Sequence, residues 1–294
     1  MRFGLASRLL RATVAEFARW MTNEYPPWAA YRGLMAGRLI ALDKMLGIRP
    51  IGIGETWRRL FAKTVILVTG DDTTEACGSE QLCAGLKAGI EGGVHAASAF
   101  WDENAKKEDT GFLLIDAKNA FNEMNRDLML WRIRFDWPKG CRFIFNCYKH
   151  WGTLFVRDQD GSKFTLFSKE GVTQGDACSM HAYGIGTLPI VHHMKNLRKK
   201  ILQLWYADDA SFGGNFNDII NLFRELKKIG PGYGYFPEPS KCVLVVNETN
   251  LEKAKTFFKE EGFQISTGKR FLGGFLGSPE GKAKYIAKKV SSWE

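Results

Sequence analysis

The sequence lacks the patterns that mark disulfide scaffolds, zinc modules and secreted proteins. Its six cysteines form no CxxC pair, and its five histidines do not stand at zinc-binding spacing from them. Charged residues between Arg2 and Arg19 interrupt the N-terminus, so no secretory signal is visible. We therefore expect reduced cysteines in an intracellular protein, with nucleus and cytoplasm both open.

Membrane spans, internal repeats, low-complexity linkers and a Walker loop are also missing. Segment 177–194 has no Asp, Glu, Lys or Arg, but Gly184, Gly186, Pro189 and three histidines favour a partly buried helix over a membrane span. No Gly-Lys-Ser/Thr follows a glycine-rich loop, which excludes a P-loop. We expect no membrane partner.

The composition is that of an ordinary globular protein. The chain has 294 residues, 45% hydrophobic and 25% charged, which suits one large or two small domains. The formal net charge of +9 favours a nucleic-acid partner only slightly over an ordinary basic surface.

Two adjacent acids, Asp208 and Asp209, interrupt the apolar stretch 204–212. Asp is poor in strands and good in tight turns, so we expect both acids at the tip of a hairpin. Neighbouring carboxylates repel each other unless a cation lies between them, and they are hard ligands of the kind Mg²⁺ takes. The alternative is a solvated turn, which is how we interpret the pair at 71–72.

A second acid, Asp116, ends the short apolar run 112–115. Such a run predicts a strand buried on both faces, with the acid held at its end. Acids from two strand ends can meet in space and hold two metal ions about 3.5–4 Å apart for phosphoryl chemistry.

Helices and strands alternate irregularly, which predicts an α+β fold. Helices are expected near 5–22, 55–68, 81–107 with an interruption at 92–93, 126–135, 138–149, 177–194, 216–228 and 251–259. Strands are expected near 38–43, 47–54, 153–157, 163–168 and 242–246, loops at 70–80 and 230–234, and a tight apolar hairpin at 271–277.

Six motifs stand in one order along the chain: RPIGIGETWRR (49–59), LLIDAKNAF (113–121), EGVTQGDACS (170–179), YADD (206–209), PSKC (239–242) and FLGGFLG (271–277). In this order the chain resembles a reverse transcriptase of the non-LTR, LINE-like retrotransposon type. The resemblance implies a right-hand polymerase with an antiparallel palm sheet and packed helices. The fingers would be 1–105 and 124–172, the palm 106–123 and 173–277, and 278–294 the start of a thumb or a tail. We expect the thumb to be largely absent and the chain to be a fragment or a degraded element copy.

The resemblance also implies an activity, RNA-directed DNA synthesis. The partners would be an RNA template, a DNA or RNA primer and dNTPs, and the cofactors two Mg²⁺ or Mn²⁺ ions. Asp116 and Asp208 would bind both metals, Asp209 would complete the triad further away, and the backbone carbonyl of Ala117 would be another ligand. The oligomeric state is open.

Further residues match nucleotide-binding positions of that family. Arg49 and Arg59 would contact the triphosphate, with Arg58 as the alternative to its neighbour, because a guanidinium suits phosphate oxygens. Phe121 would pack against the sugar and exclude a 2′-hydroxyl, although a core phenylalanine is the simpler interpretation. Lys241 would approach the pyrophosphate, unless it is only solvated.

Two loops complete the implied site. Gln174 and Gly175 would lie beside the nucleotide and the template base, where glycine allows close approach. The family commonly has Pro after the next Asp, whereas this chain has Ala177. The apolar hairpin with Phe271, Leu272, Gly273 and Gly274 would brace the primer strand, its alternative being an ordinary apolar hairpin.

Two other functions share parts of this pattern. One is an inactive nucleic-acid-binding remnant of such an element. The other is an RNA-dependent RNA polymerase, which would share the carboxylates but which Phe121 disfavours.

Overall fold

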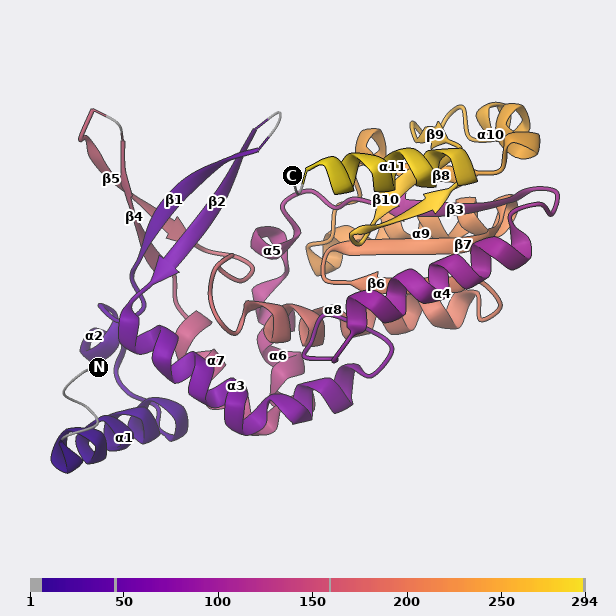
Figure 1. Cartoon of the computed structure of the whole chain (residues 1–294). Coiled ribbons are helices and arrows are strands. Elements are labelled where there is room, and N and C mark those ends of the chain that lie inside the picture. The colour runs from indigo at the N-terminus through magenta and orange to yellow at the C-terminus, as the bar shows by residue number, and fades with distance from the viewer. Residues whose placement is uncertain (1–6, 45–46, 159, 293–294) are drawn as a thin grey trace. The chain divides into compact units, whose positions relative to one another are not determined.

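The structure is a computed structural model that describes residues 7–44, 47–158 and 160–292 (Figure 1). Contacts divide the chain into two compact units, residues 1–76 with 121–186 and residues 77–120 with 187–294. Both units combine helices with sheets, which confirms the α+β class. Residues 77–105, which were expected in the fingers, belong to the second unit, and residues 173–186, expected in the palm, to the first. Fingers and palm themselves stay a prediction.

The first unit holds a four-stranded sheet in the order β2-β1-β4-β5 (Figure 1). β1 and β2 form one antiparallel hairpin, β4 and β5 another, and β1 pairs with β4 in parallel. The elements of this unit are α1 (Arg8–Asn23), α2 (Trp28–Tyr31), β1 (Gly37–Lys44), β2 (Gly47–Gly54), α3 (Thr56–Cys77), α5 (Ala120–Glu123), α6 (Arg126–Asp136), α7 (Pro138–Tyr148), β4 (Gly152–Arg157), β5 (Lys163–Ser168) and the first half of α8 (Ser179–Leu197).

The second unit holds a five-stranded sheet in the order β6-β7-β3-β8-β9. Its pairs are antiparallel except for β8 with β9, which corrects the expectation of a wholly antiparallel sheet. Its elements are α4 (Gly89–Asn104), β3 (Thr110–Ile115), β6 (Leu202–Tyr206), β7 (Asp209–Asn215), α9 (Phe216–Tyr233), the 3₁₀ turns Pro239–Lys241 and Glu248–Asn250, β8 (Val243–Val246), α10 (Leu251–Phe257), β9 (Gln264–Ser266), β10 (Gly268–Phe271), β11 (Gly274–Gly277) and α11 (Pro279–Ser291).

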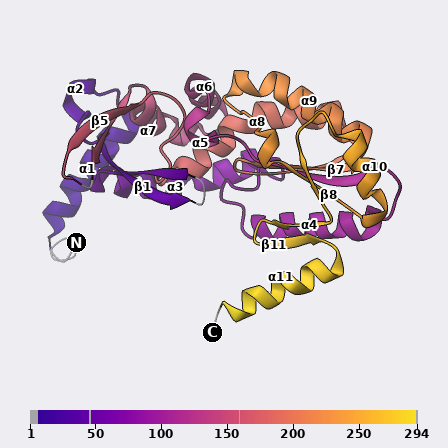
Figure 2. The same cartoon turned by 90° about the horizontal axis from the view of Figure 1, so that it is seen from above.

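The central strand β3 is apolar from Phe112 to Ile115. Phe112 and Leu113 are fully buried, because helices cover both faces. In Figure 2 the sheet is seen nearly edge-on, with α9 and α10 on one side and α4 and β11 on the other. β3 is therefore a rigid element, and the residue that follows its end is held in place.

Three expected breaks are absent because the helices continue through them. α3 runs on to Cys77, so the expected loop at 70–80 is wrong over most of its length, and Asp72 forms an ion pair with Lys139 at 2.9 Å. α4 continues through Gly92 and Gly93. α9 continues through Pro231 and ends where Gly234 adopts a left-handed backbone.

Two other features bear on the class of protein. All six cysteines lie in the described residues, and none forms a disulfide. Among the described helices, none combines the length and apolar character needed to cross a membrane.

Candidate active site: an acid-lined cavity beside the central sheet

The turn between β6 and β7 carries the adjacent acids, as the sequence predicted. Tyr206 pairs with Asp209 across the hairpin, which leaves Ala207 and Asp208 as its two central residues. Ala207 has a φ of 52°, in the left-handed region that residues other than glycine rarely adopt. A positive φ at the first central position is the mark of a type II′ turn, which suits the twist of a hairpin.

The acid at the end of β3 reaches this turn through the strand register. Ile115 pairs with Ala210 at the end of the β3–β7 ladder, so Asp116 and Asp209 lie one residue beyond its last pair, one in each segment. Both acids line one cavity at this edge. Asp116 and Asp209 stand about 93 positions apart in the sequence. In the folded chain they meet at one edge of the sheet.

The backbone after β3 continues into a bridge with the segment before Pro239. Ala117 forms a bridge with Pro237, flanked by hydrogen bonds from the Glu238 amide to the Asp116 carbonyl and from the Lys118 amide to the Phe236 carbonyl, both 2.9 Å. In a bridge of this kind the central residue directs its own N–H and C=O to the opposite side. The Ala117 carbonyl thus points away from Pro237, and its role as a metal ligand stays a prediction.

A cavity of about 140 Å³ opens beside these acids. It is lined by the acids Asp116 and Asp209, the cations Lys241, Lys269 and Arg270, and the apolar residues Leu114, Ile115, Ala210, Val243, Phe271 and Leu272. Asp208 lies outside this lining; it is half-buried, and its backbone carbonyl accepts a hydrogen bond of 2.8 Å from the Tyr235 hydroxyl. That Asp116 and Asp208 bind both metals, with Asp209 further away, stays a prediction.

The cations of the cavity sit where they neutralise the acids. A hydrogen bond to Glu238 raises the pKa of Lys241, and the charges of Glu238 and Asp116 raise it further. Lys241 is exposed and paired with Glu238, so it is ordered near Asp116 and yet accessible to an anion. Lys269 and Arg270 are exposed residues of β10 that sequence reasoning missed, although they directly precede the FLGG motif.

The oxygen atoms at this edge suit a divalent ion of the Mg²⁺ type. Two carboxylates line one cavity, and carboxylate oxygens are hard donors. Within residues 7–44, 47–158 and 160–292 no three His, Cys, Asp or Glu side chains are already gathered as a metal cluster. The donor set therefore fits an ion that keeps several ligands from water or substrate, as Mg²⁺ does.

The predicted hairpin of the FLGG motif forms one wall of the cavity. Phe271 pairs with Gly274, and Leu272 and Gly273 both have positive φ, which is typical of a type I′ turn. A Cβ on Gly274 would lie 2.9 Å from Val94, so glycine lets the hairpin pack directly on α4. The Tyr285 hydroxyl of α11 donates to the Gly273 carbonyl at 2.7 Å.

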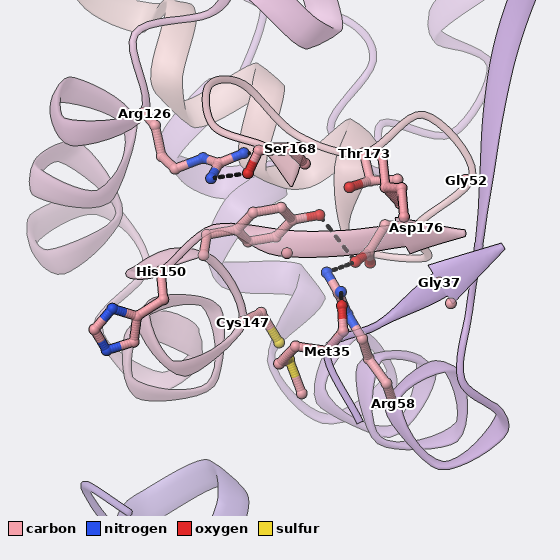
Figure 3. A pocket seen from close by; sticks show the side chains of 14 residues that line it. Met35, Gly37, Gly52, Arg58, Arg126, Cys147, His150, Ser168, Thr173 and Asp176 are labelled. Carbon is pink, nitrogen blue, oxygen red and sulfur yellow. Dashed lines mark hydrogen bonds and ion pairs between the residues drawn. The ribbon is translucent and has the colours of Figure 1, made fainter. Parts of the chain in front are cut away.

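The other predicted site residues belong to the first unit. Arg49 and Arg59 are exposed. Arg58, the alternative to Arg59, is buried and bound to Asp176 at 2.5 Å (Figure 3). Its guanidinium is therefore committed to the protein, which leaves Arg59 as the neighbour that solvent and phosphate can reach.

The loop with Gln174 and Gly175 is held against β2. The Gln174 carbonyl accepts from the Gly52 amide at 2.8 Å. Gly175 has a φ of 108°, and a Cβ there would lie 2.7 Å from the Gly52 carbonyl oxygen, so glycine is required. Phe121 is 9% exposed and stacks on Tyr183 with ring centroids 4.4 Å apart, a contact that either of its two interpretations allows.

Comparison with known proteins finds a likeness in structure only. No protein-family model and no curated protein matches the sequence. Telomerase from Candida albicans in complex with the TWJ fragment of telomeric RNA is similar at a TM-score of 0.61 and 13% identity, over 93% of this chain and 50% of that one. Apo telomerase from Candida tropicalis is similar at 0.60 and 12%, over 92% and 51%.

These likenesses show the fold and nothing finer. The chain has the reverse transcriptase fold found in telomerase, and it spans about half the length of those telomerase chains. At such low identity the fold does not carry function with it.

Proposed function

We propose that this chain is the core of an RNA-directed DNA polymerase of the non-LTR retrotransposon type. It would extend a DNA or RNA primer with dNTPs along an RNA template, using two Mg²⁺ or Mn²⁺ ions. The observation that carries the proposal is the meeting of Asp116 and Asp209 at one cavity, from strand ends that the sequence had selected for their acids. The telomerase fold and the order of the six motifs support it.

The acids would hold the reacting groups in place. Asp116, Asp209 and the Ala117 carbonyl would supply the ligands from the rigid end of β3 and the β6–β7 turn, with Asp208 completing the set from the same turn. Two divalent ions, when bound, activate the primer 3′-hydroxyl and stabilise the leaving pyrophosphate. Lys241 lies beside Asp116 with an exposed ammonium group, a suitable partner for a phosphate oxygen.

The remaining residues would bind the strands and the nucleotide. Arg49 and Arg59 would contact the triphosphate, and Phe121 would lie against the sugar of the dNTP. Gln174 and Gly175 would lie beside the template base. Lys269 and Arg270 add positive charge next to the Phe271–Gly274 hairpin that we assign to the primer. Such backbone contacts make binding sensitive to salt.

The decisive experiment is primer extension on an RNA template with matched charge variants. Asp116→Asn and Asp209→Asn should each reduce dNTP incorporation by more than about 100-fold. Loss of a metal ligand costs more activity than the loss of about 10- to 100-fold caused by removing a group that hydrogen-bonds to such a ligand. Asp71→Asn is the control, because it changes the same charge on an exposed position of α3. Circular dichroism establishes that each variant is folded.

One observation favours a second candidate, a nucleic-acid-binding remnant without activity. The formal net charge of +9 favours nucleic-acid binding whether or not the chain is catalytic. This candidate predicts salt-sensitive RNA binding by the unmodified chain and no incorporation even with Mn²⁺. Extension that survives Asp116→Asn would overturn the polymerase proposal itself.

A further inference from the structure

One buried glutamine bridges the turn that carries the adjacent acids. Gln81 lies just after α3 and is fully buried. Its Oε1 accepts from the Ala207 amide at 2.8 Å, and its Nε2 donates to the Ala207 carbonyl at 3.1 Å. The same Nε2 donates to the Thr187 hydroxyl at 3.1 Å. A single carboxamide thus satisfies both backbone groups of one residue.

The orientation of this carboxamide follows from its partners. The Ala207 N–H can only donate and the Ala207 C=O can only accept, so one end of the side chain must be oxygen and the other nitrogen. The carboxamides of Asn and Gln carry a carbonyl oxygen and an NH₂ group side by side, and Gln has the longer reach. The next residue adds to the contact, since the Leu82 amide donates to the Trp205 carbonyl at 2.9 Å along the outer edge of β6.

The residue bound in this way is the one with unfavourable backbone geometry. Ala207 has a φ of 52°, and it directly precedes Asp208 and Asp209. A non-glycine residue keeps such a conformation only when its surroundings enforce it. Relaxation of Ala207 to a negative φ would turn the peptide that leads into both acids, and Asp209 would leave its position opposite Asp116.

We propose that Gln81 is a positioning residue for the acids of the catalytic turn. Its carboxamide holds Ala207 in the left-handed conformation, and this keeps Asp208 and Asp209 aligned with Asp116 for a divalent ion. The inference rests on the proposed function for its metal, but the restraint on the turn is a property of the chain alone.

The test compares two buried glutamines on the same sheet. Gln81→Met keeps the length and removes both hydrogen bonds to Ala207. Gln203→Met is the control: Gln203 is buried on β6 and donates to the Met194 carbonyl at 2.9 Å, with no bond to the turn. We measure Mn²⁺ affinity by titration calorimetry without nucleotide, amide hydrogen exchange of peptides covering 202–212, and the thermal unfolding midpoint.

Gln81→Met should weaken Mn²⁺ binding about 10- to 100-fold, the range for partners that orient metal ligands. Exchange at the Ala207 amide should rise at least about tenfold, since the acceptor is gone. Gln203→Met should lower the unfolding midpoint by a comparable amount and leave Mn²⁺ affinity within about twofold. Equal loss of Mn²⁺ affinity in both variants would mean that Gln81 only stabilises the fold, and the inference would be wrong.

Adding Ala207→Gly to Gln81→Met tests whether Gln81 positions the turn or only stabilises the fold. Glycine adopts positive φ without strain, so Ala207→Gly added to Gln81→Met should recover part of the Mn²⁺ affinity. It should not restore protection of the amide, whose acceptor is still missing. Recovery of the thermal unfolding midpoint without recovery of Mn²⁺ affinity would mean that Gln81 only stabilises the fold.

Failure of the proposed function is distinguishable from failure of this inference. If the unmodified chain binds no Mn²⁺ and extends no primer, the polymerase proposal fails. The exchange of Ala207 then decides the restraint alone: unchanged exchange in Gln81→Met overturns it, and a rise confined to the turn supports it.

Discussion

The ion pair between Arg58 and Asp176 should be among the largest single contributions to the stability of the first unit. Both side chains are 8% exposed. The Arg58 guanidinium also donates to the Met35 carbonyl (Figure 3). The Asp176 carboxylate accepts from the Tyr148 hydroxyl and the Cys178 amide, each at 2.9 Å. Burial lowers the pKa of Arg58, but the charge of Asp176, the hydrogen bond to it and the nearby Cys147 and Tyr148 together outweigh burial, so the pKa is raised overall.

The two partners should not be equivalent. Asp176→Leu leaves a buried guanidinium, a buried hydroxyl and a buried amide without their acceptor, so we expect a loss of about 3–5 kcal/mol in the free energy of unfolding. Arg58→Met leaves the carboxylate with two donors, from Tyr148 and Cys178, so its cost should be smaller, about 2–3 kcal/mol. The double variant should cost less than the sum of the two, because an apolar pair of similar volume replaces both charges.

The assay is urea unfolding followed by tryptophan fluorescence, analysed as a double-mutant cycle. We expect a coupling energy of about 1–3 kcal/mol between the two positions. A cost below about 1 kcal/mol for Asp176→Leu would be the value of an exposed pair, and it would refute the burial on which the reasoning depends. Purely additive costs would refute the direct contact.

Three further outcomes follow from particular residues. Gly171→Ala should destabilise the chain by more than about 1 kcal/mol in thermal unfolding, because the φ of Gly171 is +60° and a Cβ would lie 2.1 Å from the Phe121 carbonyl oxygen. Gly92→Ala, in open space on α4, should instead stabilise the chain by about 0.5–1 kcal/mol. Equal changes in stability for the two variants would contradict this prediction. Burial lowers the pKa of His181 below its unfolded value of 6.5, so the contribution of His181 to stability is present above about pH 6.5 and is lost as the pH falls. His181→Gln should therefore flatten the plot of unfolding free energy against pH between about pH 7 and 5. An unchanged slope of that plot would contradict the prediction. Phe121→Ala should cost about 3–5 kcal/mol and raise the ratio of NTP to dNTP incorporation in primer extension, while an unchanged ratio would leave Phe121 as a core residue stacked on Tyr183.

The elements that carry the acids could be predicted because their signals are local. An apolar run that ends in Asp116 and a pair of acids between two apolar stretches each indicate a strand and its end within a few residues. The hairpin at 153–168 and the helices at 126–136 and 138–148 were predicted for the same reason. Strand order and the parallel pair of β8 and β9 depend on distant contacts and have no local signal.

The helix ends were predicted less well because tertiary contacts override local preference. Gly70, Thr73 and Thr74 favour a loop by composition, yet α3 continues through them. Both threonine hydroxyls donate to the Gly70 carbonyl within the helix, at 2.7 and 3.2 Å, and Thr73 is fully buried. The burial of one face decided the outcome, and a single sequence does not show which face will be buried.

The residues of the site also differ in how well the sequence predicts them: those proposed to do chemistry could be found, and those that hold them in place could not. Asp116 and Asp209 could be found because carboxylates at strand ends have few structural reasons to be there. Gln81 and Arg58 could not, since each contacts its partner across more than a hundred residues, 126 positions from Ala207 and 118 from Asp176. A polar side chain gains its role from the group that it meets, and that meeting exists only in the folded chain. This is why the variants that matter most for the proposed metal centre lie at Gln81 and Ala207 as well as at the acids: the ligands show where a reaction could occur, and the buried amide decides whether they stay aligned for it.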